Sequence, residues 1–598
     1  MKNVYKLLVA GICVMTLASC GDNFLTRDPY GSTITQGQYE KLANQLEGSM
    51  RGIYSMMYEV SDHDQFGKRS IDMYTDLMCG DMALTNYTYG WFYNDEQGLG
   101  RTSRTGYIWY YYYGMLHNVN AVLNAAQGGN GSASADNVIK RIAAVGLPNT
   151  VDKSKEDIMY YRIQSTNIDT TLNGVDTTIV RKDTLASFTE VESVIADCYA
   201  QALTMRGFIY SNLLMLYCEV NVNDFKTELA FPLYNESNMN EAQPLATMSA
   251  VYTQVESDLT EAIDYFDAFS EIEHSSKLIV DKSIASAILA YSYLNKGNTK
   301  RKDDEAYVTA YGNALKYAKM AIESSKCQIL PRASLFETGF NNVSNVSWMW
   351  GQNVTVETAG GLASWFGQCD IHSYSYAWSG DTKAIDANLY KLIPDFDARK
   401  QWFNDGSANA TYKLCPDGKF FSASNPTSTK ADDIDREWLS DNVFMRIESM
   451  YLTAAEASYR LHNEGDALNY LTAITDQRLS ADTTFDVAAA YSAYKATLTD
   501  KELLKAIEYN WRVEMWGEGY GLQTFRRLSS EVLGENERKR GENHSANPGS
   551  KITATSEYTF QMPAAEGSYN PSINTTKLPE YKQKDIIIKR ILFTLLIN

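Results

Sequence analysis

The sequence lacks the short motifs that mark common nucleotide, serine-hydrolase and zinc sites. It contains no Gly-x-x-x-x-Gly-Lys-Ser/Thr phosphate loop, no Gly-x-Ser-x-Gly nucleophile elbow and no His-Glu-x-x-His pair. Only six histidines occur in 598 residues, and they are scattered along the chain. These absences argue against nucleotide and zinc chemistry. They argue only weakly against a glycoside hydrolase, which needs just two opposed carboxylates.

The chain also lacks an excess of positive charge. It has 54 Lys and Arg residues against 73 Asp and Glu residues, and its net charge is -19. This balance disfavours nucleic acid as a partner, because an acidic surface repels the phosphate backbone. Hydrophobic residues make up 44% of the chain, so it can bury a core and wholesale disorder is excluded. Length alone allows about four domains, although repeat folds often form longer units.

No segment has the run of about 20 apolar residues that spans a bilayer. The N-terminus instead has the pattern of a secretory signal, in which Lys2 and Lys6 precede a short apolar run. That run ends in Leu-Ala-Ser directly before Cys20, which resembles a bacterial lipobox. We therefore predict that residues 1–19 are removed, that Cys20 is lipidated and that the mature protein is anchored rather than integral. The alternative is a plain secretory signal with an incidental cysteine.

Candidate metal ligands are sparse, and the cysteines beyond Cys20 fit no zinc-binding spacing. Cys198 and Cys218 flank one helical pattern and would lie about 30 Å apart on a single helix, too far for a disulfide. The segment Asp62-His63-Asp64 could touch a cation, but three adjacent side chains on an exposed segment usually face water. We predict no metal site and no cofactor. We expect free thiols at Cys79, Cys198, Cys218, Cys327, Cys369 and Cys415.

Apolar residues recur with helical spacing along most of the chain. Residues at i, i+3, i+4 and i+7 form one apolar stripe on each expected helix. The clearest stripes begin at Tyr112, Tyr210, Leu259, Ile284, Ala314, Ile447 and Ala467. Several stripes are joined in pairs by turns that contain glycine, and the offset within a pair varies. We predict a mainly α fold with about four irregular tetratricopeptide-like helical hairpins and a few short strands.

Aromatic residues gather in two irregular stretches, residues 76–106 and 340–382. Tyrosine alone accounts for 41 residues, beside 10 Trp and 21 Phe. Such rings stack on ligands, but they also fill the edge of a core. Trp348 and Trp350 share one face of a short expected strand and are predicted to belong to the core. Residues 404–436 are polar and are predicted to form a surface loop.

Several segments resemble motifs of one protein family and occur in that family's order. Residues 446–457, Arg-Ile-Glu-Ser-Met-Tyr-Leu-Thr-Ala-Ala-Glu-Ala, resemble the R-x-x-E-x-Y-L-x-x-A-E-A segment of SusD/RagB-like proteins. Residues 511–519, Trp-Arg-Val-Glu-Met-Trp-Gly-Glu-Gly, resemble their R-[VI]-E-[LF]-x-x-E-G segment, although Thr524 stands where an Asp is usual. Residues 562–571, with Met-Pro, Glu and Asn-Pro, resemble the closing segment.

The resemblance implies a SusD-like helical domain over residues 39–581, after a lipidated tether at residues 20–38. It implies a lipoprotein on the outer face of a Bacteroidetes-type outer membrane. Such a protein binds glycan without catalysis and passes it to a SusC-like TonB-dependent barrel transporter. Oligopeptide capture is the alternative within the family, and a cell-surface glycoside hydrolase is the alternative from another class. The apolar tail at residues 582–598 is atypical of the family and is assigned no function.

The family landmarks Arg512, Glu514 and Glu518 are interpreted as structural. A guanidinium and two carboxylates near a helix end more often fix that end by charge-assisted hydrogen bonds than bind a ligand.

We predict that the ligand site lies on the two aromatic stretches. Sugar rings have apolar C–H faces that stack on flat aromatic rings, and their hydroxyls then need polar partners. For any single ring, the alternative is that it fills a gap beneath a loop. The candidate ligand-binding residues are Asn86, Tyr89, Trp91, Tyr93, Asp95, Trp365, Tyr374, Tyr376 and Trp378.

Overall fold

The computed structural model describes residues 36–129, 137–154, 157–172, 175–219, 226–272, 276–297, 305–336, 339–355, 357–407, 409–420, 440–532, 538–552 and 558–573. Cys20, the predicted signal peptide and the tail at residues 582–598 lie outside these ranges. Helix α2 begins at Gln36, inside the segment 20–38 that was predicted as tether.

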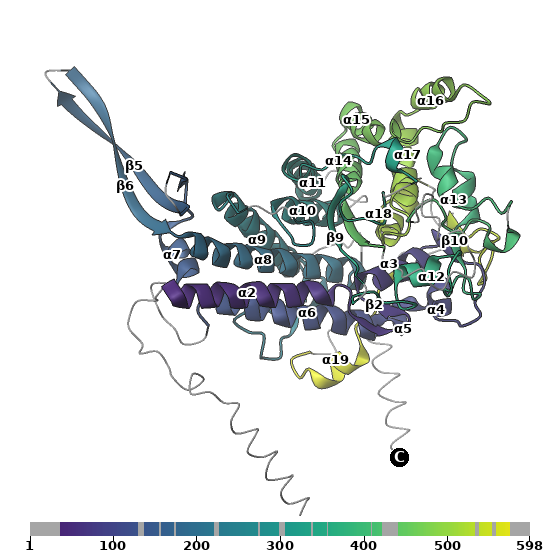
Figure 1. Cartoon of the computed structure of the whole chain (residues 1–598), viewed down its shortest axis with the longest axis horizontal. Coiled ribbons are helices and arrows are strands. Elements are labelled where there is room, and N and C mark those ends of the chain that lie inside the picture. Colours follow the sequence, from purple (N-terminus) through teal and green to yellow (C-terminus); the bar gives the residue numbers. More distant parts are fainter. Residues whose placement is uncertain are drawn as a thin grey trace, which may run out of the picture.

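Long helices form the frame of the molecule (Figure 1). They are α2 (Gln36–Met56), α6 (Thr105–Ala126), α8 (Glu190–Tyr217), α9 (Met248–Ala268), α10 (Lys282–Lys296), α11 (Glu305–Ser324), α14 (Ile447–Arg460), α15 (Glu464–Thr475), α17 (Asp500–Glu514) and α18 (Gly521–Val532). Helix α8 packs on α2, α6 and α9, and α10 pairs with α11 as α14 pairs with α15. The last two pairs are those whose stripes the sequence predicts, and the mainly α fold is confirmed.

Shorter helices and small sheets fill the irregular regions. The short α-helices are α3 (Lys68–Met78), α4 (Tyr93–Glu96), α5 (Gly100–Ser103), α7 (Val138–Val145), α12 (Trp365–Cys369), α13 (Ala387–Lys391), α16 (Val487–Lys495) and α19 (Ala564–Tyr569). The strands are β1 (Val60–Asp62), β2 (Gln65–Phe66), β3 (Met82–Leu84), β4 (Thr150–Asp152), β5 (Met159–Leu172), β6 (Val175–Phe188), β7 (Leu229–Pro232), β8 (Leu245–Thr247), β9 (Trp348–Gln352), β10 (Lys383–Ile385), β11 (Asn442–Arg446), β12 (Arg538–Lys539) and β13 (Lys551–Ile552). The pairs β1–β2, β3–β10, β7–β8, β9–β11 and β12–β13 are antiparallel, as is the sheet β4–β5–β6.

Local sequence explains where the long helices begin. Thr189 and Glu192 form a reciprocal capping box at the start of α8. The Asp281 carboxylate accepts a hydrogen bond from the Ile284 N–H at 3.0 Å and caps α10. The stripe that begins at Tyr112 is buried along α6, as its spacing predicts.

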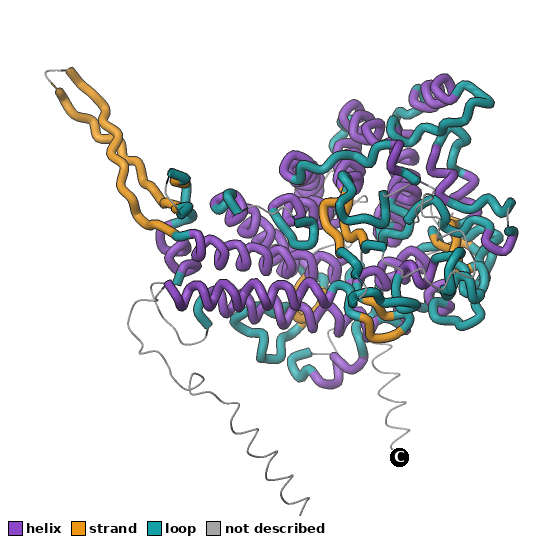
Figure 2. The backbone as a smooth tube through the Cα atoms, viewed as in Figure 1, coloured by secondary structure: helices purple, strands orange, loops and turns teal. Residues whose placement is uncertain are grey.

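Strands β5 and β6 form a two-stranded ribbon that projects from one end of the helical body (Figures 1 and 2). At its base, the rings of Tyr160 and Phe188 lie 5.0 and 6.1 Å from the ring of Phe269. Farther out, Ile168 and Ile179 face each other across the strands and are exposed. The sequence analysis did not predict this ribbon, although an Asn-Gly pair between two runs rich in β-branched residues is a hairpin signal.

Removal of residues 164–183, with Ile163 joined to Thr184 through Asn-Gly, is expected to change the melting temperature by less than about 2 °C. Ile163 and Thr184 already face each other across the strands. An isolated two-stranded ribbon is only marginally stable, so its outer part adds little to the helical core. Differential scanning calorimetry of both chains measures the difference. A loss of more than about 5 °C would show that the ribbon packs on the body.

The core contains most of the tryptophans and cysteines of the described residues. Trp348 and Trp350 are fully buried in β9, which confirms their predicted place. The six cysteines that were expected as free thiols form no disulfide with one another. Within the ranges that the structure describes, no helix is long and apolar enough to span a membrane.

Eight charged side chains form a buried ionic cluster. They are Asp397, Arg399, Lys419, Arg446, Glu448, Arg478, Glu514 and Glu518. The carboxylate of Glu514 accepts hydrogen bonds from Arg399 and Arg446, each at 3.2 Å, and from Arg478 at 2.8 Å. Burial alone would raise the pKa of Glu514, but the three guanidinium groups hold it well below its usual range. The structural interpretation of Glu514 and Glu518 agrees with this burial.

The prediction that residues 404–436 form a surface loop is wrong at the end of residues 404–420, the part of this segment that the structure describes. Lys419 and Phe420 are buried. The Lys419 ammonium donates to the Glu518 carboxylate at 2.8 Å and to two backbone carbonyl oxygens. A buried carboxylate needs a charged partner, and this partner comes from a segment whose composition is otherwise polar.

Candidate functional site

Pairing between β3 and β10 brings the two aromatic stretches together. Beyond the strands, the Thr85 N–H donates to the carbonyl oxygen of Thr382 at 2.8 Å, and the Thr88 N–H donates to that of Gly380 at 3.0 Å. Segments 87–95 and 374–381 therefore lie side by side although they are far apart in sequence. Figure 1 shows α4, α12 and β10 at the end of the molecule opposite the ribbon.

A cluster of four rings occupies the centre of this region. Tyr89 and Trp91 lie edge-on to Tyr376, with ring centroids 5.2 and 6.2 Å away. His63 comes from the turn between β1 and β2 and stacks on Trp91 with centroids 5.2 Å apart. The Nδ1 atom of His63 lies 2.8 Å from the Tyr376 hydroxyl. Tyr89 is 54% exposed, so the cluster presents an aromatic face to solvent.

Two further ring pairs flank the cluster. Tyr87 stacks on Tyr93 with centroids 4.3 Å apart, and Tyr374 lies 5.6 Å from Trp378. Tyr87, Tyr374 and Trp378 are exposed, and Asn86 beside them is exposed as well. We call the whole set the aromatic surface: His63, Tyr87, Tyr89, Trp91, Tyr93, Tyr374, Tyr376 and Trp378. Its rings can stack on an apolar ligand face while the hydroxyl, amide and imidazole groups form hydrogen bonds.

A buried polar layer holds the aromatic surface from beneath. The Lys383 ammonium donates to Gln368 Oε1 at 2.8 Å and to the Asp381 carbonyl oxygen at 2.9 Å. Gln368 Nε2 donates to the carbonyl oxygen of His63, and the Asp381 carboxylate accepts from the Tyr89 N–H, both at 2.8 Å. Burial lowers the pKa of Lys383. This layer ties together the three chain segments that carry the central rings.

Asp95, a candidate ligand partner, faces the core. Its carboxylate accepts hydrogen bonds from Nε and Nη2 of Arg104 at 3.0 and 2.8 Å. Burial raises the pKa of Asp95 to about 6, and Arg104 opposes that rise. Arg104 also donates to the carbonyl oxygen of Trp91. Asp95 therefore supports the loop from below, out of reach of a ligand on the surface.

Tyr376, at the centre of the aromatic surface, is also buried at 7% exposed, and Trp365 has no exposed area. The Trp365 ring packs against Phe420 with centroids 4.2 Å apart, and the guanidinium of Arg69 lies 5.3 Å from its centroid. A side chain on Gly517 would be in tight contact with these rings, with its Cβ 3.0–3.1 Å from the nearest ring atoms. The position of Trp365 is that of a core residue.

The aromatic surface thus unites Tyr89, Trp91, Tyr93, Tyr374, Tyr376 and Trp378 of the candidates, with Asn86 at its rim. Sequence reasoning missed His63 and Tyr87 as members. The sequence around His63 indicates at most a contact with a cation, and no local pattern indicates that this turn reaches the other two stretches.

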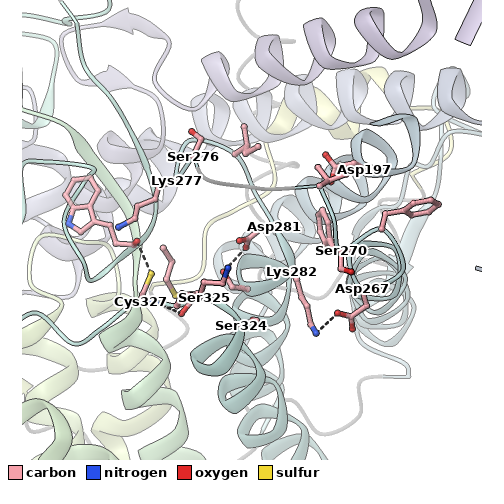
Figure 3. A pocket seen from close by; sticks show the side chains of 18 of the residues that line it. Asp197, Asp267, Ser270, Ser276, Lys277, Asp281, Lys282, Ser324, Ser325 and Cys327 are labelled. Carbon is pink, nitrogen blue, oxygen red and sulfur yellow. Dashed lines mark hydrogen bonds and ion pairs between the residues drawn. The ribbon is translucent and has the colours of Figure 1, made fainter. Parts of the chain in front are cut away.

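A hollow of about 820 Å³ lies elsewhere, near the ends of α9, α10 and α11 (Figure 3). Several of its charged groups already stabilise the walls. Lys282 pairs with Asp267 at 2.6 Å, and Asp281 caps α10. The Cys327 thiol donates to the carbonyl oxygen of Trp348 at 3.2 Å. This hollow offers polar walls without an exposed aromatic platform, so the aromatic surface is the better candidate.

Comparison with known proteins gives a consistent result. Residues 288–581 match the model of the SusD family. A SusD-like carbohydrate binding protein from Bacteroides vulgatus shares 18% identity and a TM-score of 0.59, with 90% of this chain and 98% of that chain covered. A SusD superfamily protein from Bacteroides thetaiotaomicron shares 17% identity and a TM-score of 0.60, with 89% and 99% covered. At these identities the similarity concerns the fold. None of the curated proteins matches this chain.

Proposed function

This chain belongs to the SusD/RagB-like family, and on that premise we propose that it binds oligosaccharides at the aromatic surface without breaking them down. The observation that carries the proposal is the assembly of exposed rings from two distant stretches over one buried polar layer. Stacking needs flat rings at fixed positions, and the layer of Gln368, Asp381 and Lys383 fixes them.

Polar groups at the rim favour a hydroxylated ligand. Asn86 and the tyrosine hydroxyls can pair with sugar hydroxyls, each of which would cost about 1–3 kcal/mol if buried without a partner. Glycoside hydrolysis needs two carboxylates that flank the scissile bond. Asp95 and Asp381 instead turn inward and are engaged by protein groups. This arrangement supports capture rather than cleavage.

We further propose that the protein is a lipoprotein of the outer membrane surface, anchored through Cys20. A captured oligosaccharide must still cross that membrane, and a SusC-like TonB-dependent barrel would supply the route. The support is the Leu-Ala-Ser-Cys sequence and the match to the SusD family, a resemblance that implies a barrel partner. Residues 1–35 lie outside the described ranges, so this part of the proposal rests on sequence.

Cys20→Ala is expected to move the protein from the membrane fraction to the soluble fraction of cells that lack the barrel partner, because lipid is the proposed anchor. Immunoblots of separated fractions measure the change. Cys327→Ala removes a half-buried thiol of the folded domain and is the matched control, expected to stay with the membrane. Persistence of the Cys20 variant in the membrane would contradict the lipobox.

The function is tested with soluble protein that starts after Cys20. Isothermal titration calorimetry with maltohexaose, cellohexaose, xylohexaose and mannohexaose is followed by chromatography of each mixture after prolonged incubation. Binding with intact sugars supports the proposal. Shortened sugars would establish a hydrolase instead. If the protein binds members of an oligopeptide library and none of the four sugars, it captures peptides. If it binds neither sugars nor peptides, the proposal of ligand capture is overturned.

A further inference from the structure

His63 lies in a turn that is fixed from beneath. Gln368, which is fully buried, donates to the His63 carbonyl oxygen at 2.8 Å. The next residue, Asp64, is buried, and its carboxylate accepts from Arg104 while its carbonyl oxygen accepts from the Tyr74 hydroxyl. The backbone of the turn therefore has a defined position at the edge of the aromatic surface.

The imidazole of His63 is exposed, yet it is held in one orientation. One face of the ring stacks on Trp91, and Nδ1 is hydrogen-bonded to the Tyr376 hydroxyl. Within the described residues, Nε2 has no hydrogen-bond partner. An exposed side chain that is already immobilised has little conformational freedom to lose when a ligand binds. The outward edge of this ring is thus prepared for a contact.

A cation site does not account for this arrangement. The Asp62 carboxylate accepts the N–H of His63 at 2.7 Å, and the Asp64 carboxylate turns inward to Arg104. The three adjacent side chains diverge instead of converging on one point.

We propose that His63 is a ligand-contacting residue of the aromatic surface, whose Nε2–H donates a hydrogen bond to an oxygen atom of the bound oligosaccharide. When the Tyr376 hydroxyl donates to Nδ1, a neutral imidazole carries its proton on Nε2, the outward atom. The free edge is then a donor, which matches the hydroxyl and ring oxygens of sugars. This inference rests on the proposed function of the aromatic surface.

Two variants remove the Nε2 donor in different ways. His63→Phe keeps a flat ring against Trp91, and His63→Asn keeps a short acceptor for the Tyr376 hydroxyl. Both are expected to weaken binding of the tightest of the four hexasaccharides about fivefold, the typical effect of one lost hydrogen bond. His117→Ala changes an exposed histidine on α6 and is the matched control. In the unmodified protein, saturating sugar should also shift the ¹⁵Nε2 resonance of His63 and leave that of His117 unchanged.

The outcomes separate the two proposals. Weaker binding by both His63 variants at unchanged melting temperature, together with the resonance shift, supports the contact. If the unmodified protein binds a hexasaccharide and both variants bind it equally well, the contact is overturned while the proposed function stands. If the unmodified protein binds none of the four sugars, both proposals are overturned.

Discussion

Glu514→Gln is expected to lower the free energy of unfolding by about 3–5 kcal/mol, because it leaves buried arginines without their shared carboxylate. Glu514 contacts Arg399, Arg446 and Arg478, and all four side chains are almost completely buried. Glutamine keeps the size and one acceptor oxygen, so the loss reports charge and hydrogen bonding rather than a cavity. Urea unfolding followed by circular dichroism measures the difference.

Two controls isolate this effect. Glu323→Gln changes an exposed carboxylate on α11 and is expected to alter stability by less than about 0.5 kcal/mol. Arg478→Met combined with Glu514→Gln is expected to cost less than the sum of the two single changes, because the partners share one interaction. Additive costs, or a Glu514 variant as stable as the control, would contradict the role of the cluster.

The pH dependence of the Glu514 effect has a definite sign. The folded-state pKa of Glu514 is lowered from 4.5, so its contribution to stability is present above the unfolded-state pKa. That contribution is lost as the pH falls through the folded-state pKa. The stability gap between the unmodified protein and Glu514→Gln should therefore be full at pH 7 and narrow below pH of about 4. A stability gap that widens as the pH falls would contradict the lowered folded-state pKa of Glu514.

Trp365→Ala and Trp91→Ala are expected to have opposite consequences. Loss of the Trp365 ring leaves a cavity beside Phe420 and should cost about 3–5 kcal/mol of stability while the folded protein binds ligand normally. Trp91→Ala should leave the melting temperature nearly unchanged and weaken ligand binding about tenfold, as removal of one central contact does. Calorimetric melting and titration of both variants measure the two effects.

The same pair of variants contains its own controls. Each ring is a tryptophan from one of the predicted aromatic stretches, so the two changes remove the same atoms from different depths. Early melting of Trp91→Ala with normal binding would place that ring in the core. Weak ligand binding by a Trp365→Ala variant of unchanged stability would show that the Trp365 ring contacts the ligand.

The helical frame was predictable because helix patterning is local. The stripes that begin at Tyr112, Ile284 and Ile447 all lie on observed helices, since a period of 3.6 residues marks one buried face. The core place of Trp348 and Trp350 followed in the same way from strand spacing. The ribbon was not predicted although its signal was local, because a helical period of 3.6 residues does not detect strands, whose period is two.

The aromatic surface was predictable only in part. The two stretches could be found by composition, and Tyr89, Trp91, Tyr374, Tyr376 and Trp378 do meet on one surface. Composition does not report depth, and Asp95, Trp365 and Tyr376 proved to be buried. The burial of Lys419 was also not predictable, because its partner Glu518 is distant in sequence.

By itself, the sequence determined the helical frame, the family-like motifs and the segments in which aromatic residues gather, because each is a property of neighbouring residues. The tertiary structure alone decided which rings face solvent. Trp365 and Trp378 belong to one stretch, yet the first packs against Phe420 and the second is exposed. The tertiary structure also brought His63 to Trp91 and Tyr376. Pairing of β3 with β10 and the buried contacts of Gln368 and Lys383 join segments that are distant in sequence, so no local pattern could specify these contacts.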